Sequence, residues 1–204
     1  MNLNPATRDL EIGRQQPMTE PASDTELIAR MAKGDQRAMP LLFARHRTRV
    51  HRFVLRRVRS EAMAEELVNE TFLAVWQQAG RFEGASSATT WMLAIAHNKA
   101  VSALRKRREE ALDEDATAAI PDSGDSPETS LAKVGKAGIL RACLNRLPDE
   151  QRVVMDLVYY HEQSVKEVSE VLGVPENTIK TRMFYARKKL SEMLKTAGVD
   201  RGWP

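Results

Sequence analysis

The sequence predicts an all-α fold, with two small helical domains joined by a flexible acidic linker and a helix-turn-helix in the C-terminal domain. Apolar residues recur at helical spacing through most of the chain, and no segment shows the strict alternation of a half-buried strand. An acidic stretch with few large apolar residues interrupts this pattern. The 204 residues are 42% hydrophobic and 29% charged, which is typical of a soluble globular protein with a modest core in each half.

The first domain is predicted at residues 22–108, after a tail at 1–21 whose prolines and polar residues predict disorder. Its first helix begins at Asp24 and breaks at Gly34. A second helix runs on through Val58, with apolar residues on one face and arginines on the others. This part of the chain is therefore strongly basic.

Two further helices are expected in the same domain. One begins near Glu61 and ends at Gly80. The loop 81–87 is rich in turn-forming residues, and it leads to a helix capped by Thr89 or a neighbouring hydroxyl. This last helix ends in the basic run 105–108.

A linker is predicted at residues 109–130. The stretch contains prolines, serines and several acidic residues but no Lys or Arg, and it has too little apolar surface to build a packed element. It is therefore expected to be a flexible acidic spacer between basic neighbours.

The second domain is predicted at residues 131–196, followed by a tail at 197–204. Helices are expected over 131–147 and 148–160, the second one beginning at a proline. They precede the helix-turn-helix at 164–190.

Glycine and proline mark the turn of this motif. Gly173 provides the left-handed residue that ends the first helix, and Pro175 fits the first turn of the second, which runs to about Leu194. The apolar positions of two crossed helices are Val168, Leu172, Val174, Ile179 and Met183.

The second helix of the motif is basic, and its exposed faces mix cationic, aromatic and hydrogen-bonding side chains. A DNA recognition helix needs this mixture, because cations bind phosphates while shaped side chains read base edges. A solvated basic face on an ordinary helix has the same composition, but the preceding turn favours DNA. The candidate contacts are Lys180, Thr181, Arg182, Phe184, Tyr185, Arg187 and Lys188.

No catalytic site is predicted. The four histidines lack metal-ligand spacing, the lone Cys143 has no evident base, and no phosphate-binding glycine loop is visible. We therefore expect no enzymatic activity, no metal and no cofactor.

The chain is expected to be cytoplasmic and not inserted in a membrane. No apolar stretch approaches the ~20 residues of a membrane span, and the N-terminus lacks the apolar region of a signal peptide. A single cysteine also agrees with a reducing compartment.

Three sequence blocks occur in order along the chain. They are Ala64-Glu-Glu-Leu-Val-Asn-Glu-Thr-Phe-Leu-Ala-Val-Trp76, then Phe82-Glu-Gly with Trp91-Met-Leu-Ala-Ile-Ala-His-Asn98, then Leu147-Pro-Asp-Glu-Gln-Arg-Val-Val154 before the helix-turn-helix. With these blocks the chain resembles the sigma-70 family of bacterial RNA polymerase specificity factors, in particular the compact extracytoplasmic-function (ECF) group.

The resemblance implies that the first block docks on the clamp helices of core RNA polymerase. It also implies that the chain contacts the polymerase flap. The residues alone show a polar rim on an amphipathic helix, which could equally be a solvent-exposed face that binds no partner. The candidate polymerase contacts are Glu65, Glu66, Asn69, Glu70 and Gln77.

The second block resembles the part of such factors that opens the promoter and captures bases of the minus-10 element. Exposed bases need stacking partners and edge hydrogen bonds, and basic groups must hold the backbone. The candidate contacts are Phe82, Ser86, Ser87, Asn98, Lys99, Arg105, Arg107 and Arg108, although Phe82 is equally a candidate core aromatic.

The resemblance also implies that the helix-turn-helix reads the minus-35 element as duplex and that an anti-sigma protein inhibits the factor. Two alternatives stay open from the residues alone. One is a self-sufficient helix-turn-helix regulator, and the other is a recombinase or nuclease, which the lack of clustered carboxylates or nucleophiles disfavours.

Overall fold

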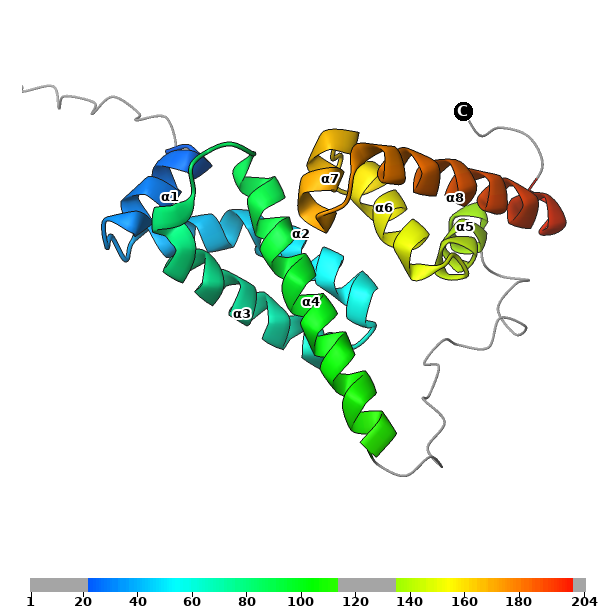
Figure 1. Ribbon diagram of the computed structural model, residues 1–204, viewed down its shortest axis with the longest axis horizontal. Coiled ribbons are helices and arrows are strands. Elements are labelled where there is room, and N and C mark those ends of the chain that lie inside the picture. The colour runs from blue at the N-terminus through cyan, green and yellow to red at the C-terminus, as the bar shows by residue number, and fades with distance from the viewer. Residues whose placement is uncertain (1–21, 114–134, 200–204) are drawn as a thin grey trace, which may run out of the picture.

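The computed structural model describes residues 22–113 and 135–199, and every regular element within these two ranges is a helix (Figure 1). The first domain comprises α1 (Asp24–Ala32), α2 (Ala38–Val58), α3 (Glu61–Gln78), the 3₁₀ helix η1 (Ala79–Arg81) and α4 (Ala88–Asp113). The second comprises α5 (Lys136–Asn145), α6 (Asp149–Tyr159), α7 (Val165–Leu172) and α8 (Glu176–Thr196).

The predicted all-α fold with two helical domains is confirmed. The expected tail at 1–21, most of the expected linker (114–130) and residues 200–204 lie outside the described residues.

Serine side chains fix the start of helices in both domains. Ser23 and Ser164 each form a capping box, in which the serine hydroxyl accepts from a backbone N–H and the glutamate three residues later accepts from the serine N–H. Ser60 caps α3. At α4, the Thr90 N–H donates to Ser87 Oγ over 3.0 Å, so the cap is Ser87, the neighbouring hydroxyl, and not Thr89.

The first domain packs its helices around large apolar side chains that are fully buried. Phe53 of α2 and Phe72 of α3 are the largest of these, and Leu27, Leu42 and Met92 join them from α1, α2 and α4. Each of these helices buries one apolar stripe, so four amphipathic helices close a single core.

The second domain has its own small apolar cluster where α5, α6 and α8 meet. It contains Cys143, Leu147, Met155, Ala186 and Leu190. Burial raises the pKa of the Cys143 thiol. The thiol is therefore protonated at neutral pH and serves as a core side chain.

The last turns of α4 project beyond the rest of the domain (Figure 1). The helix continues past residue 108, where the sequence suggested a boundary. Arg105 and Glu109 are 3.8 Å apart and Lys106 and Glu110 3.6 Å apart, each pair four residues along the helix. Such pairs stabilise an exposed helix by a few tenths of a kcal/mol each, which favours extra turns.

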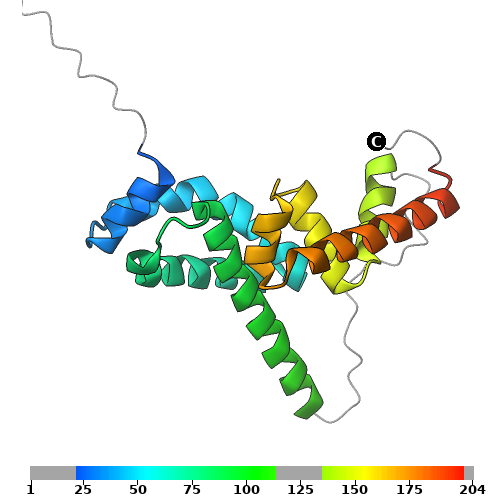
Figure 2. The same cartoon turned by 45° about the horizontal axis from the view of Figure 1, so that its top comes forward.

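The two domains pack against each other. Figure 2 shows α7 lying between α4 and α8, and α6 also contacts α2. The apolar side chains of this contact, among them Val154, Leu157 and Val168, belong to the same buried cluster as Met92 and Leu93 of α4. One apolar core therefore runs through both domains.

Polar groups complete this contact. The Thr90 hydroxyl lies 2.8 Å from Gln163 Oε1 and 3.2 Å from Glu167 Oε1. Gln163 is buried, and its Nε2 donates to the backbone oxygen of His161 over 3.1 Å. The interface is thus held by a satisfied buried network as well as by apolar burial.

Arginines of α2 form a second polar link to the other domain. Arg56 pairs with the buried Asp156 of α6, and Arg57 pairs with Asp149 over 3.1 Å. Asp156 also lies 3.5 Å from the buried His161 ring. The domain contact therefore joins opposite charges carried by the two halves.

We predict that Gln163→Ala loosens the domain contact. The variant loses the buried amide that links Thr90 to the second domain, at a cost of about 1 kcal/mol, or roughly a fivefold fall in the ratio of packed to separated domains. Small-angle X-ray scattering, or energy transfer between dyes on α3 and α8, measures this ratio. Lys166→Ala, on the exposed face of α7, is the control and leaves it unchanged; equal values for both variants contradict the prediction.

Candidate nucleic-acid interface

The turn of the helix-turn-helix is fixed by Gly173 and Ser169. Gly173 has φ +66° and ψ 30°, the left-handed conformation expected at the end of α7. The Ser169 hydroxyl donates to the Val174 carbonyl oxygen over 2.6 Å and so ties α7 to the entry of α8. Pro175 stands one position before the first helical residue of α8, where it has no N–H to leave unpaired.

One stripe of α8 is buried, and this determines which side chains face outward. Ile179, Met183, Ala186 and Leu190 are buried against the rest of the domain. With 3.6 residues per turn, the opposite face carries Thr181, Phe184, Tyr185 and Lys188.

The outward face of α8 presents two aromatic rings to solvent. Phe184 is 63% exposed and Tyr185 is 54% exposed, and their rings meet edge to face with centroids 5.4 Å apart. Thr181 and Lys188 are also exposed. The face therefore offers apolar, hydroxyl and cationic groups together, as a base-reading surface requires.

The flanks of α8 carry the other predicted contacts. Lys180 lies 3.7 Å from Glu176, an exposed pair that a phosphate can replace. Arg187 Nε donates to the Tyr159 hydroxyl of α6 over 3.1 Å, which positions its guanidinium beside the outward face. Arg182 lies on the opposite flank and pairs with Glu150 over 2.6 Å, so it is the predicted contact most engaged within the protein.

The predicted minus-10 residues at the start of α4 are held by local packing. Phe82 is half-buried and packs against Trp91, with ring centroids 4.9 Å apart and ring planes tilted by 40°. Ser86 is half-buried, and the hydroxyl of Ser87 caps α4 and lies 2.7 Å from Thr90 Oγ1. Phe82 thus packs against the core, and the loop exposes the side chains of Glu83, Ala85 and Ser87.

Further along α4, most of the predicted contacts are open to solvent. Asn98 is exposed. Lys99 pairs over 2.9 Å with Glu70, itself a predicted polymerase contact. Arg105, Arg107 and Arg108 are exposed on the projecting end. The structure therefore gathers a basic surface on this end of α4, away from its capped start.

Thr90 is a residue of the domain contact that the sequence did not single out. Its buried hydroxyl stands between Ser87 and the second domain. The sequence contains one indication of its position. Thr90 is three residues after the capping serine, which places it in the first turn of the helix.

The predicted polymerase-docking residues lie along one side of α3. Glu66, Asn69, Glu70 and Gln77 are exposed, as an interface with a partner requires. Glu65 is also exposed, but both of its oxygens accept from Arg47, over 3.0 and 3.2 Å.

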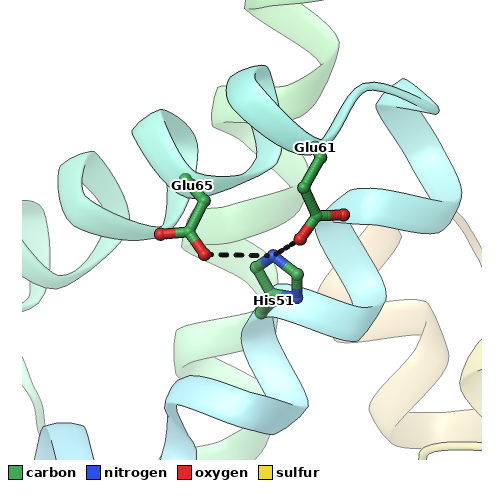
Figure 3. Close-up of side chains that lie close together, drawn as sticks. All are labelled: His51, Glu61 and Glu65. Atoms are coloured by element: carbon green, nitrogen blue, oxygen red, sulfur yellow. Dashed lines mark ion pairs between the residues drawn. The ribbon is translucent and has the colours of Figure 1, made fainter.

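His51 of α2 reaches toward two carboxylates of α3 (Figure 3). Its Nε2 lies 3.1 Å from Glu61 and 3.7 Å from Glu65, and the three groups bring ligand-type atoms within 4.8 Å of one another. Because Arg47 already engages both oxygens of Glu65, the cluster is an ion-pair network that joins α2 to α3.

Of the helices within residues 22–113 and 135–199, none combines the length and hydropathy that a membrane span needs.

Two family descriptions match the chain, one for each domain. Sigma-70 region 2 matches residues 42–110, and Sigma-70 region 4 matches residues 137–190. The first covers most of α2, α3 and α4, and the second runs from α5 through most of α8.

Curated relatives match over most of their length. The ECF RNA polymerase sigma factor SigK of Mycobacterium tuberculosis is 34% identical over 173 residues, which is 82% of this chain and 91% of the relative. The RNA polymerase sigma-H factor of Pseudomonas aeruginosa is 27% identical over 180 residues, 84% of this chain and 93% of the relative.

Two solved structures are similar in fold. One is CnrH in complex with the cytosolic domain of CnrY, with TM-score 0.62, 25% identity, and 85% of this chain and 97% of that one covered. The other is the sigma factor RpoE of Bartonella quintana with the anti-sigma factor NepR, with TM-score 0.60, 27% identity, and 78% and 96% covered.

These matches define the class, a transcription initiation factor built from a region 2 domain and a region 4 domain. The chain belongs to the sigma-70 family, in its ECF group.

We predict that His97 makes folding acid-sensitive. Burial disfavours the charged ring and Arg57 repels it, which lowers the pKa of His97 from 6.5 to about 4, while Asp149 opposes the shift. Between pH 6.5 and 4, His97 therefore binds a proton in the unfolded chain but stays neutral in the folded chain. The free energy of unfolding falls as the pH drops through this range. Urea unfolding at pH 7 and pH 5 measures the fall, and His97→Gln reduces it. An unchanged pH slope in that variant contradicts the prediction.

Proposed function

We propose that this chain directs core RNA polymerase to its promoters by holding DNA at two places. The observation that carries the proposal is the pairing, in one chain, of the outward face of α8 with the basic surface on α4. The first suits the major groove of intact duplex, and the second suits the backbone of an opened strand.

The helix-turn-helix domain is proposed to bind the minus-35 element. A helix fits the major groove of B-DNA, and the exposed groups of α8 include a hydroxyl, two aromatic rings and cations. Lys180 and Lys188 are then phosphate or base contacts, and Arg187 is positioned for the same role by the hydroxyl of Tyr159.

The first domain is proposed to hold the minus-10 element after melting. Asn98 offers both a donor and an acceptor to a base edge, and the cations of the projecting end of α4 follow the backbone. Ser86 and Ser87 complete the surface at the start of the helix.

The exposed side of α3 is proposed to dock on the clamp helices of the polymerase, and the chain is proposed to contact the flap as well. The helix buries its other face and exposes polar side chains on this one. An exposed polar face of this kind suits a transient protein interface. The proposed contacts are Glu65, Glu66, Asn69, Glu70 and Gln77.

We further propose that the chain carries no enzymatic activity, acts in the cytoplasm and is inhibited by an anti-sigma protein. Both similar solved structures are complexes, of CnrH with CnrY and of RpoE with the anti-sigma factor NepR, which supports such control here. The chemistry of RNA synthesis then belongs to the polymerase, and the two DNA-binding domains are proposed at residues 22–113, to the end of α4, and 131–196.

Run-off transcription with purified core polymerase tests the function. With this chain added, we expect promoter-dependent transcripts from a subset of genomic fragments, because core polymerase alone lacks promoter specificity. The alternative, a stand-alone regulator, predicts fragment binding by the chain without initiation. No initiation on any fragment would reject the sigma function in favour of that alternative.

We predict that the two DNA contacts can be weakened separately. Lys180→Ala and Arg187→Ala each lose one groove or phosphate contact and weaken minus-35 duplex binding about tenfold, measured by fluorescence anisotropy. Asn98→Ala leaves that binding intact and lowers open-complex formation, measured by permanganate reactivity of unpaired thymines.

Matched controls lie on the same helices. Lys195→Ala, in the last turn of α8, and Ser102→Ala, one turn beyond Asn98, should each keep wild-type values. Equal loss of duplex binding and of melting in all three test variants would contradict the proposed division.

A further inference from the structure

A cavity of about 270 Å³ lies between the two domains. Its walls come from the end of α2 and from α5 and α6 of the second domain. Leu55, Leu144 and Val153 form its apolar part. Because both domains line it, the cavity is complete only when they are packed together.

The lining of the cavity is strongly cationic. Five arginines line it, against one aspartate, Asp156. Three arginines come from the first domain and two from the second; they are Arg56, Arg57, Arg59, Arg141 and Arg152. Like charges from two separate domains thus converge on one space.

Arg57, in the lining of the cavity, has a buried hydrogen-bond donor without an acceptor among the described residues. Its side chain is only 9% exposed, and one of its terminal nitrogens pairs with Asp149. Its Nε–H, however, is a buried donor with no acceptor in the part of the chain that the structure describes. A buried guanidinium donor without an acceptor is costly, and an anion in the cavity could satisfy it.

Arg152 shows the electrostatic cost of this arrangement. Burial lowers its pKa, and the positive charges of Arg59 and Arg57 lower it further, while Asp149 and Asp156 act in the opposite direction. Asp149 also pairs directly with Arg152. An added negative charge in the cavity would relieve the remaining repulsion.

We propose that this cavity binds a small polyphosphate anion, either inorganic pyrophosphate or the phosphate tail of a nucleotide. Guanidinium groups bind phosphate oxygens in pairs of parallel hydrogen bonds, so several converging arginines select an anion with several oxygens. The volume is at the small end of ligand sites, which suits a compact anion.

One feature of the lining would distinguish the two sources of phosphate. Tyr160 lies at the wall, half exposed, with the Arg56 guanidinium 3.7 Å from its ring centroid. Its remaining ring surface can pack against the base of a nucleotide, which pyrophosphate lacks.

The site has a consequence for the proposed function, on which this part of the inference rests. An anion held by arginines of both domains binds the packed arrangement more tightly than the separated one, and it therefore increases the packed population. The ligand would keep the two DNA-binding domains together until it leaves.

Isothermal titration of the full chain with sodium pyrophosphate, and separately with ATP, tests the site. We expect one anion per chain and about tenfold weaker binding in Arg141→Ala, which removes an exposed arginine of the lining. Arg146→Ala is the matched control, since it removes an exposed arginine from the end of α5 outside the lining. It should bind within twofold of wild type.

The outcomes separate clearly. Saturable binding of pyrophosphate that is lost in Arg141→Ala supports the site. Tighter binding of ATP than of pyrophosphate would indicate a further contact to the nucleoside. No saturable binding of either anion, or equal weakening in both variants, overturns it. Scattering should also show a more compact chain with pyrophosphate, and no change in size would refute the effect on domain packing.

Failure here is distinguishable from failure of the proposed function. Run-off transcription by the wild-type chain tests the proposed function, whereas anion titration of the free chain, with no polymerase or DNA present, tests the cavity. Binding is the primary readout, because RNA polymerase itself releases and reacts with pyrophosphate.

Discussion

Burial of α4 on two sides is the constraint on which the rest of the structure depends. One side packs on α2 and α3 and completes the core of the first domain, and the other receives α7 of the second domain. The apolar core is continuous as a result. Neighbouring side chains therefore stabilise both the first domain and its contact with the second. A change at Met92 or Leu93 would affect the free energy of both.

Electrostatics divides the arginines of the first half into groups with different surroundings. Arg56 and Arg57 face the second domain and its aspartates, whereas Arg47 neutralises Glu65 on the side proposed to meet the polymerase. The cations at the end of α4 pair only with neighbours one turn away or lie exposed. A net charge of +3 for the chain hides this separation. The distribution of charge, more than its sum, determines what each surface can bind.

Most of the fold could be predicted from the sequence, because it depends on local signals. Apolar spacing located the helices, Gly173 and Pro175 located the turn of the helix-turn-helix, and the buried stripe of α8 determined its outward face. The domain contact could not be predicted, since Thr90 meets Gln163, and Arg56 meets Asp156, only through the packing of helices distant in sequence. For the same reason the sequence did not separate Arg182, which pairs with Glu150, from the more exposed cations of α8. The individual DNA and polymerase contacts stay predictions.

The continuity of α4 gives the proposed strand binding an order. At 1.5 Å per residue, about 27 Å of rigid helix separates Thr90, which α7 covers, from the open cations at Arg108. An incoming strand can therefore dock on the far end while the domains are still closed. At the other end, Thr90 stays buried under the second domain as long as the domains are packed, so a bound strand would reach that part of the helix last.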